Sequence, residues 1–120
     1  MAKKSTHPTD LDHLRRQAVA LAEKFATAAR RAGRKPWTRE EIAQGLVVDV
    51  GDLIRLVMAK AGRRNVVNTD RKFGHELADC LWSMLVLADL YGVDLEVEFE
   101  KMVSGVGRKL ERKKRSKSSL

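Results

Sequence analysis

Residues 46–53 read Leu-Val-Val-Asp-Val-Gly-Asp-Leu, and residues 75–79 read His-Glu-Leu-Ala-Asp. Each stretch places two carboxylates three positions apart inside an otherwise apolar run, and these are Asp49, Asp52, Glu76 and Asp79. Residues i and i+3 share one face of a helix, so each pair points in one direction. The Gly-Arg-Arg-Asn segment at residues 62–65 allows the second helix to fold back on the first. We therefore predict that four carboxylates converge between two packed helices.

Four uncompensated negative charges in an apolar setting would repel one another and be poorly solvated. A hard divalent cation, which takes oxygen ligands, is the simplest resolution. A single pair of carboxylates at this spacing is most often part of a solvated helix surface. Two pairs that both interrupt apolar runs on neighbouring helices favour a metal site.

The composition is that of one soluble domain. The chain has 120 residues, of which 43% are hydrophobic and 33% charged, and aromatic residues are few. The lone cysteine, Cys80, excludes an internal disulfide and suits a reducing compartment. No apolar stretch reaches membrane-spanning length, and the N-terminal residues lack the apolar segment of a secretory signal. We expect a cytoplasmic protein.

The basic charge of the chain is concentrated near its C-terminus. Residues 108–117 hold seven basic residues and one acidic residue, and so account for six of the eight net positive charges. From residue 112 the sequence lacks apolar periodicity. We predict a flexible arm at residues 1–8, a helical domain at residues 9–111 and a basic disordered tail at residues 112–120. Such a tail would attract nucleic acid weakly and in a salt-dependent way.

Apolar spacing and helix-capping signals predict an all-α fold with four helices. The expected helices run from Leu11 to near Gly33, from Arg39 to Ala61, from Asp70 to Tyr91, and from Leu95 onward, with the last one weakened at Gly105 and Gly107. The second and third helices are apolar nearly all round, which requires burial on more than one side. In so small a protein this indicates a partner subunit, and we expect a homodimer or tetramer.

The chain resembles the MazG-like nucleotide pyrophosphohydrolases, all-α NTP pyrophosphatases that include dCTP pyrophosphatase. Their signature is Glu-x-x-Glu, a spacer and Glu-x-x-Asp. The matching text is Asp-Val-Gly-Asp at residues 49–52 and Glu-Leu-Ala-Asp at residues 76–79. Tyr-Gly-Val-Asp-Leu at residues 91–95 is similar to the family's later Gly-Ile-Asp-Leu passage. The resemblance covers about residues 11–110.

This resemblance implies a four-helix bundle that is oligomeric and cleaves a (deoxy)nucleoside triphosphate to the monophosphate and pyrophosphate. It implies that Mg²⁺ is the cofactor and that the four carboxylates are both its ligands and the catalytic residues. The residues agree with this chemistry, because such cleavage needs charge neutralisation and an oriented water more than a nucleophilic side chain.

Three departures from the family pattern leave a second interpretation open. Asp49 and Asp52 are each one methylene shorter than the usual Glu. Val48 stands where many members have a further Glu, and Gly105 stands where dCTP pyrophosphatase-like members have Asn. The alternative is a MazG-like helical bundle that has lost catalysis and serves as a nucleotide-binding, nucleic-acid-binding or regulatory module.

Other residues are candidates for contacts with the substrate. The cations that could neutralise phosphates are Lys60, Lys101, Arg108 and Lys109, and for each except Lys101 a solvated helix end is at least as good an interpretation. Trp37 could stack on a base, although a hydrophobic plug at the helix entrance is slightly favoured. For Trp82 we favour packing over a place in the pocket, and for Cys80 a buried apolar role.

Overall fold

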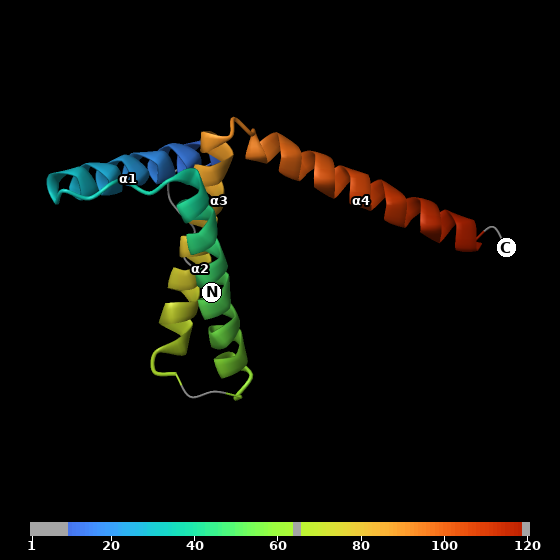
Figure 1. Ribbon diagram of the computed structural model, residues 1–120. Helices are drawn as coiled ribbons and strands as arrows, with labels where there is room; N and C mark the ends of the chain where they lie inside the picture. Colours follow the sequence, from blue (N-terminus) through green and yellow to red (C-terminus); the bar gives the residue numbers. More distant parts are fainter. Residues whose placement is uncertain (1–9, 64–65, 119–120) are drawn as a thin grey trace.

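The computed structural model describes residues 10–63 and 66–118, which contain four α-helices and no β-strand (Figure 1). The helices are α1 (Leu11–Arg31), α2 (Arg39–Lys60), α3 (Thr69–Leu90) and α4 (Leu95–Ser118). The predicted all-α class and the predicted four helices are confirmed. The predicted arm at residues 1–8 lies outside the described residues. No described helix is both long enough and apolar enough to cross a membrane.

Local signals in the sequence set the ends of these helices. At the start of α2, the Glu41 amide donates to the Thr38 hydroxyl (3.1 Å), and the Thr38 amide donates to the Glu41 carboxylate (3.0 Å). This is the reciprocal arrangement that the Thr-x-x-Glu pattern predicts. Gly92 ends α3 in the left-handed region (φ 67°), which glycine adopts without steric cost. Asp94 then caps α4 by accepting from the Val97 amide (3.1 Å).

α2 and α3 form an antiparallel hairpin, and they pack against each other more extensively than any other pair of described helices (Figure 1). Leu56 of α2 is the most deeply buried large side chain described, with 1% of its surface exposed. Cys80 of α3 is also buried, as predicted for a small apolar residue. The hairpin therefore fixes how residues of the two helices face each other.

α1 packs against the C-terminal half of α3 (Figure 1). Ala18 of α1 joins Leu85 and Val86 of α3 in a buried cluster. Polar contacts fix the same interface, because the Trp82 indole donates to the Ala18 carbonyl oxygen (3.1 Å) and Arg15 pairs with Asp89 (2.6 Å). α3 is therefore the central helix, in contact with α2 on one side and α1 on another.

α4 departs from the other three helices and projects away from them (Figure 1). The four helices do not all lie side by side within one chain. The prediction of a disordered tail from residue 112 is wrong for the described part, because α4 continues through Ser118. Gly105 and Gly107 each cost about 1 kcal/mol of helix propensity, but the Arg, Lys, Leu and Glu residues that follow them are good helix formers. Basic side chains at the C-terminal end also complement the helix dipole.

Much apolar surface of the hairpin is uncovered. Most of the exposed apolar residues form two rows, Val47, Val50, Ile54 and Val57 on α2 and Leu77, Leu81 and Met84 on α3, while Val48 lies outside them. Val47 keeps 72% of its surface exposed. The members of each row recur at alternating spacings of three and four residues, which is the spacing of helix–helix seams. We refer to these seven residues as the hairpin face.

Candidate metal centre

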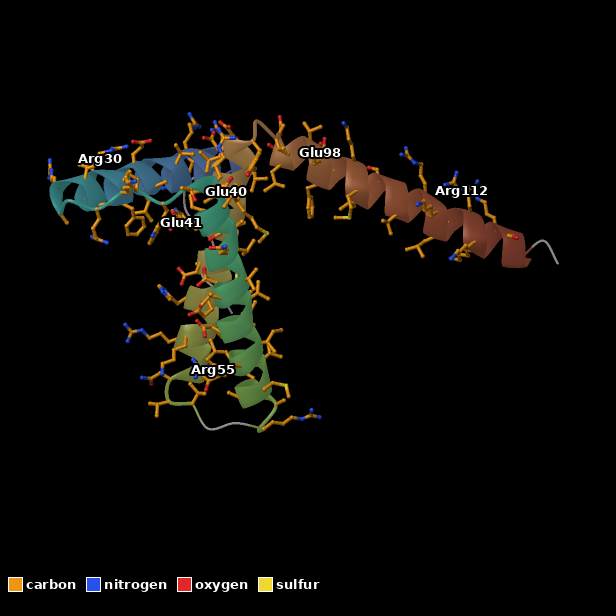
Figure 2. The ribbon with its side chains drawn as sticks, in the orientation of Figure 1. Arg30, Glu40, Glu41, Arg55, Glu98 and Arg112 are labelled. Atoms are coloured by element: carbon orange, nitrogen blue, oxygen red, sulfur yellow. The ribbon has the colours of Figure 1, made fainter. Side chains whose placement is uncertain are left out.

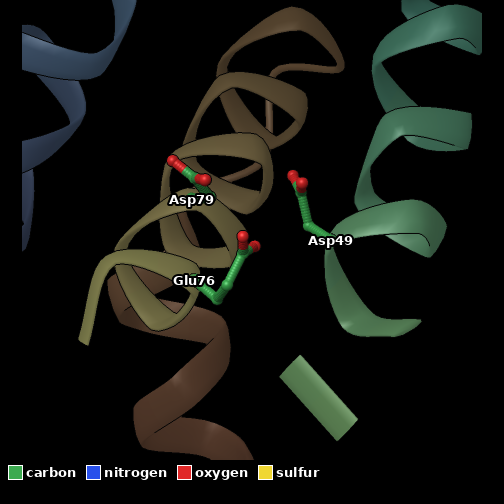
Figure 3. Close-up of side chains that lie close together, drawn as sticks. All are labelled: Asp49, Glu76 and Asp79. Carbon is green, nitrogen blue, oxygen red and sulfur yellow. The ribbon is translucent and has the colours of Figure 1, made fainter. Parts of the chain in front are cut away.

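Three carboxylates from two helices converge where α2 packs against α3. Asp49 belongs to α2, whereas Glu76 and Asp79 belong to α3, and all three point toward one another (Figure 3). One oxygen from each lies within 4.8 Å of the other two. Oxygens on one divalent cation lie about 4–5 Å apart at most, so the spacing suits a shared ion after small side-chain adjustments. We refer to these residues as the triad.

The burial of the triad fits a cation ligand. All three side chains are half-buried, and Glu76 Oε2 is fully buried with no hydrogen-bond partner among the described residues. An unpaired buried carboxylate oxygen is costly, because it has lost water and gained nothing in exchange. A cation at the triad would remove that cost. The partial exposure of the triad leaves room for the waters that Mg²⁺ usually keeps.

Burial and mutual repulsion also raise the pKa values of two triad carboxylates. Burial raises the pKa of Asp49 above its ordinary value of 3.8, and the nearby charges of Asp79 and Asp52 raise it further. Burial also raises the pKa of Glu76 above 4.5, followed by the charges of Asp79, Asp52 and Asp49. His75 opposes both shifts. The site therefore favours either a proton or a cation.

Asp52, the fourth predicted ligand, lies near the triad but is not part of it. Its charge raises the pKa of both Asp49 and Glu76, so it lies close to them. The converging oxygens nevertheless come only from the other three residues. Asp52 is about one helical turn further along α2 than Asp49, so its carboxylate is displaced along the helix from the common point.

His75 lies on α3 beside the triad. Its Nε2 lies 3.3 Å from Asp79 Oδ2, and its side chain is 73% exposed. The i, i+4 spacing of His75 and Asp79 on one helix was the signal that could have indicated this contact. A protonated His75 would compete with a cation for Asp79.

A large cavity lies beside α3, beyond the triad. Its volume is about 710 Å³, and it is lined by the end of α1, the linker to α2, the start of α2 and the second half of α3. Phe25 lies between two tryptophans, with ring centroids 5.7 Å from Trp37 and 5.8 Å from Trp82. Arg39 lies over the Tyr91 ring at 5.1 Å. The cavity thus combines aromatic walls with cations, including Arg30 and Arg34.

The two tryptophans contribute to this cavity in different ways. Trp37 lines it and is 58% exposed, so its ring remains accessible. Trp82 lines it too, while its indole also anchors α1 to α3. Sequence reasoning missed Phe25 and Tyr91 as cavity residues. The place of Phe25 near the end of α1, close in sequence to Trp37, was the available signal.

The predicted phosphate-binding cations do not reach the triad within one chain. Lys60 pairs with Asp70 and lies over the Phe73 ring at 5.3 Å. Lys101 pairs with Glu98 (3.5 Å), and the other two candidates, Arg108 and Lys109, are exposed on α4. Because α4 projects away from the hairpin, it carries these three side chains away from the carboxylates (Figure 1).

Comparison with models of known protein families gives no match to this chain, and comparison with curated proteins gives no match either.

The raised pKa values predict how stability responds to pH when no divalent cation is present. The folded state binds protons at Asp49 and Glu76 more tightly than the unfolded chain does. The free energy of unfolding therefore falls as pH rises from the ordinary pKa values through the raised ones. At higher pH both carboxylates are ionised in the folded state, and the whole loss of stability persists. We expect Asp49→Asn and Glu76→Gln each to be more stable than the wild type at pH 7 in chelator.

The measurement is urea unfolding between about pH 4 and pH 8, and the advantage of both variants should fade toward the acidic end. Glu111→Gln, on the exposed part of α4, is the matched control and should show no such advantage. Variants less stable than the wild type at pH 7 would show that the carboxylates stabilise the fold without a cation.

Proposed function

We propose that this protein is a Mg²⁺-dependent nucleoside triphosphate pyrophosphohydrolase, which converts a (deoxy)nucleoside triphosphate to the monophosphate and pyrophosphate. The observation that carries the proposal is the convergence of Asp49, Glu76 and Asp79, with its orphaned Glu76 Oε2. The resemblance of the Asp-x-x-Asp and Glu-x-x-Asp stretches to the MazG-like signature supports the same assignment.

The triad residues would hold the cation. When bound, Mg²⁺ neutralises phosphate charge and lowers the pKa of a coordinated water. The carboxylates fix the place of the reaction between α2 and α3, and Asp52 adds negative charge beside them. Cys80 is not a candidate nucleophile, because it is buried and burial raises the pKa of its thiol. Hydrolysis here would use water rather than a covalent intermediate.

The aromatic cavity would hold the base. Trp82 follows Asp79 by one helical turn on α3, so the wall of the cavity begins close to the triad. A volume of about 710 Å³ is within the range of small-molecule sites. A nucleotide could then lie along α3 with its base among the rings and its phosphates at the carboxylates.

A second candidate function is a binding module without catalysis. The observation that favours it is that Lys60, Lys101, Arg108 and Lys109 do not meet the triad within one chain. Such a module would still bind a divalent cation. Hydrolysis and cation binding must therefore be measured separately.

We further propose that a second copy of the chain covers the hairpin face. Two rows of large apolar side chains are too much surface for a small soluble protein to leave in water. Two hairpins packed face to face would form a four-helix bundle across the interface. This satisfies the requirement that α2 and α3 be buried on more than one side.

The catalytic proposal is tested by measuring pyrophosphate release from a panel of ribo- and deoxyribonucleoside triphosphates. We expect activity with Mg²⁺ and none in excess chelator. Asp79→Asn and Glu76→Gln should each lower the rate by about 100-fold or more, because each removes a ligand that stabilises transition-state charge. Activity that survives both substitutions would refute the mechanism.

A matched control is Asp52→Asn, which removes a nearby charge from outside the triad and should have a smaller effect. Thermal unfolding with and without Mg²⁺ separates the two functions, because a cation that binds the folded state raises the melting temperature. Stabilisation by Mg²⁺ without hydrolysis of any nucleotide would favour the binding module.

The role of the cavity is tested by Trp37→Ala. Stacking of a base on an aromatic ring contributes about 1–3 kcal/mol, so KM should rise about tenfold or more with little change in kcat. Trp37→Phe should retain most of the affinity. Trp37 suits this test because it is exposed, whereas Trp82 also holds α1 in place. An unchanged KM in Trp37→Ala would place the base elsewhere.

The proposed hairpin interface is tested by Ile54→Glu, which puts a charge in the centre of an apolar face. We expect the dissociation constant of this interface to rise by roughly 100-fold or more, as for a hot-spot residue. Light scattering should show a smaller assembly than the wild type, with Arg55→Glu on the same helix as control. A wild-type mass of 13.5 kDa at micromolar concentration would contradict the proposal.

A further inference from the structure

α4 carries an apolar stripe that nothing else in the described chain covers beyond its first residue. The stripe consists of Leu95, Phe99, Met102, Val106 and Leu110. Leu95 packs against the buried cluster of α1 and α3, so the stripe continues outward from the core. Phe99 and Leu110 are 58% and 62% exposed. The spacings of three and four residues place all five side chains on one side of the helix, as in the seam of a coiled coil.

The charges along α4 are divided between its two halves. The first half is mainly acidic, with Glu96, Glu98 and Glu100 against Lys101. The second half is mainly basic, with Glu111 among the basic residues Arg108, Lys109, Arg112, Lys113, Lys114 and Arg115. Figure 2 shows the division through Glu98, near the start of α4, and Arg112, near its far end. α4 therefore has an acidic end, a basic end and one apolar stripe that runs between them.

We propose that α4 pairs in antiparallel orientation with α4 of a second copy of this chain. An antiparallel pair buries both stripes against each other and sets each acidic half beside a basic half. A parallel pair would instead place like charges together, which destabilises helix pairs. A membrane surface or a nucleic acid fits less well, because the three glutamates would be repelled by an anionic partner.

The stripe also fixes the register of the pair. Centring the two-fold axis near Ser104 places Phe99 opposite Leu110 of the second copy and Met102 opposite Val106. Glu98 and Lys109 flank the stripe on the same side, and in this register each lies beside the other on the second copy. The two copies of Phe99 are then separated by about 16 Å along the pair.

This pairing is separate from the hairpin face, since it uses a different helix that projects from the hairpin (Figure 1). Each contact relates two copies by a two-fold axis, so together they would assemble a dimer of dimers. Disrupting one contact should leave dimers held by the other. Ile54→Glu combined with Phe99→Glu should leave a monomer of 13.5 kDa.

Crosslinking between introduced cysteines tests the orientation directly. Phe99→Cys and Leu110→Cys chains are prepared alone and coexpressed, and each sample is treated with a short bifunctional maleimide. The wild type, whose Cys80 is buried, is the control. We expect crosslinked dimers only from the coexpressed pair. Crosslinked dimers from Phe99→Cys alone, or none from the pair, would overturn the proposal. If the coexpressed pair gives no crosslink and the wild type binds anionic vesicles, the stripe is a membrane-binding surface and the proposal is wrong.

Charge reversal provides a second test that leaves the stripe intact. Glu98→Lys and Lys109→Glu should each weaken assembly through α4 by about fivefold at low salt, because each disturbs two symmetric ion pairs. The double variant Glu98→Lys with Lys109→Glu restores opposite charges in an antiparallel pair. Its dissociation constant for the α4 contact should return to that of the wild type. Circular dichroism confirms that α4 remains helical. A double variant as weak as the single variants would also overturn the proposal.

Discussion

The packing of α2 against α3 is the interaction on which the rest of the structure depends. It buries Leu56 and Cys80, and it also forces Asp49 toward Glu76 and Asp79. Apolar contact offsets the repulsion of three carboxylates that would otherwise stay apart in water. α1 is placed by the same helix pair, because it docks on α3 one turn beyond the carboxylates. The cavity lies where α1, the start of α2 and the second half of α3 meet, because α3 packs against both of the other helices.

The sequence predicted the bounds of α1, α2 and α3 within about two residues, since periodicity and capping are local properties. It failed for the last part of α4, where Gly105 and Gly107 predicted a weakened helix and the charged residues from residue 112 predicted disorder. There the helix-forming propensity of those charged residues prevails. The direction in which α4 leaves the core was not predictable, because it depends on a four-residue connection rather than on any repeating pattern.

For the candidate site, the sequence predicted which residues share a helix face but not which of them meet across the two helices. Of the four carboxylates in the i, i+3 pairs, Asp49, Glu76 and Asp79 converge, whereas Asp52 lies about one helical turn further along α2. The cations of α4 could not be placed without knowing where that helix goes. The cavity was also beyond prediction, because Phe25 and Tyr91 reach it from segments far apart in the sequence.

The aromatic wall of the cavity has a practical consequence. The chain has two tryptophans and one tyrosine, and Trp37, Trp82 and Tyr91 all line this one cavity. The near-ultraviolet absorbance and the intrinsic fluorescence of the whole protein therefore arise from a single place. Any molecule that enters there displaces solvent from every strong chromophore at once, so the protein carries its own optical reporter and needs no attached dye.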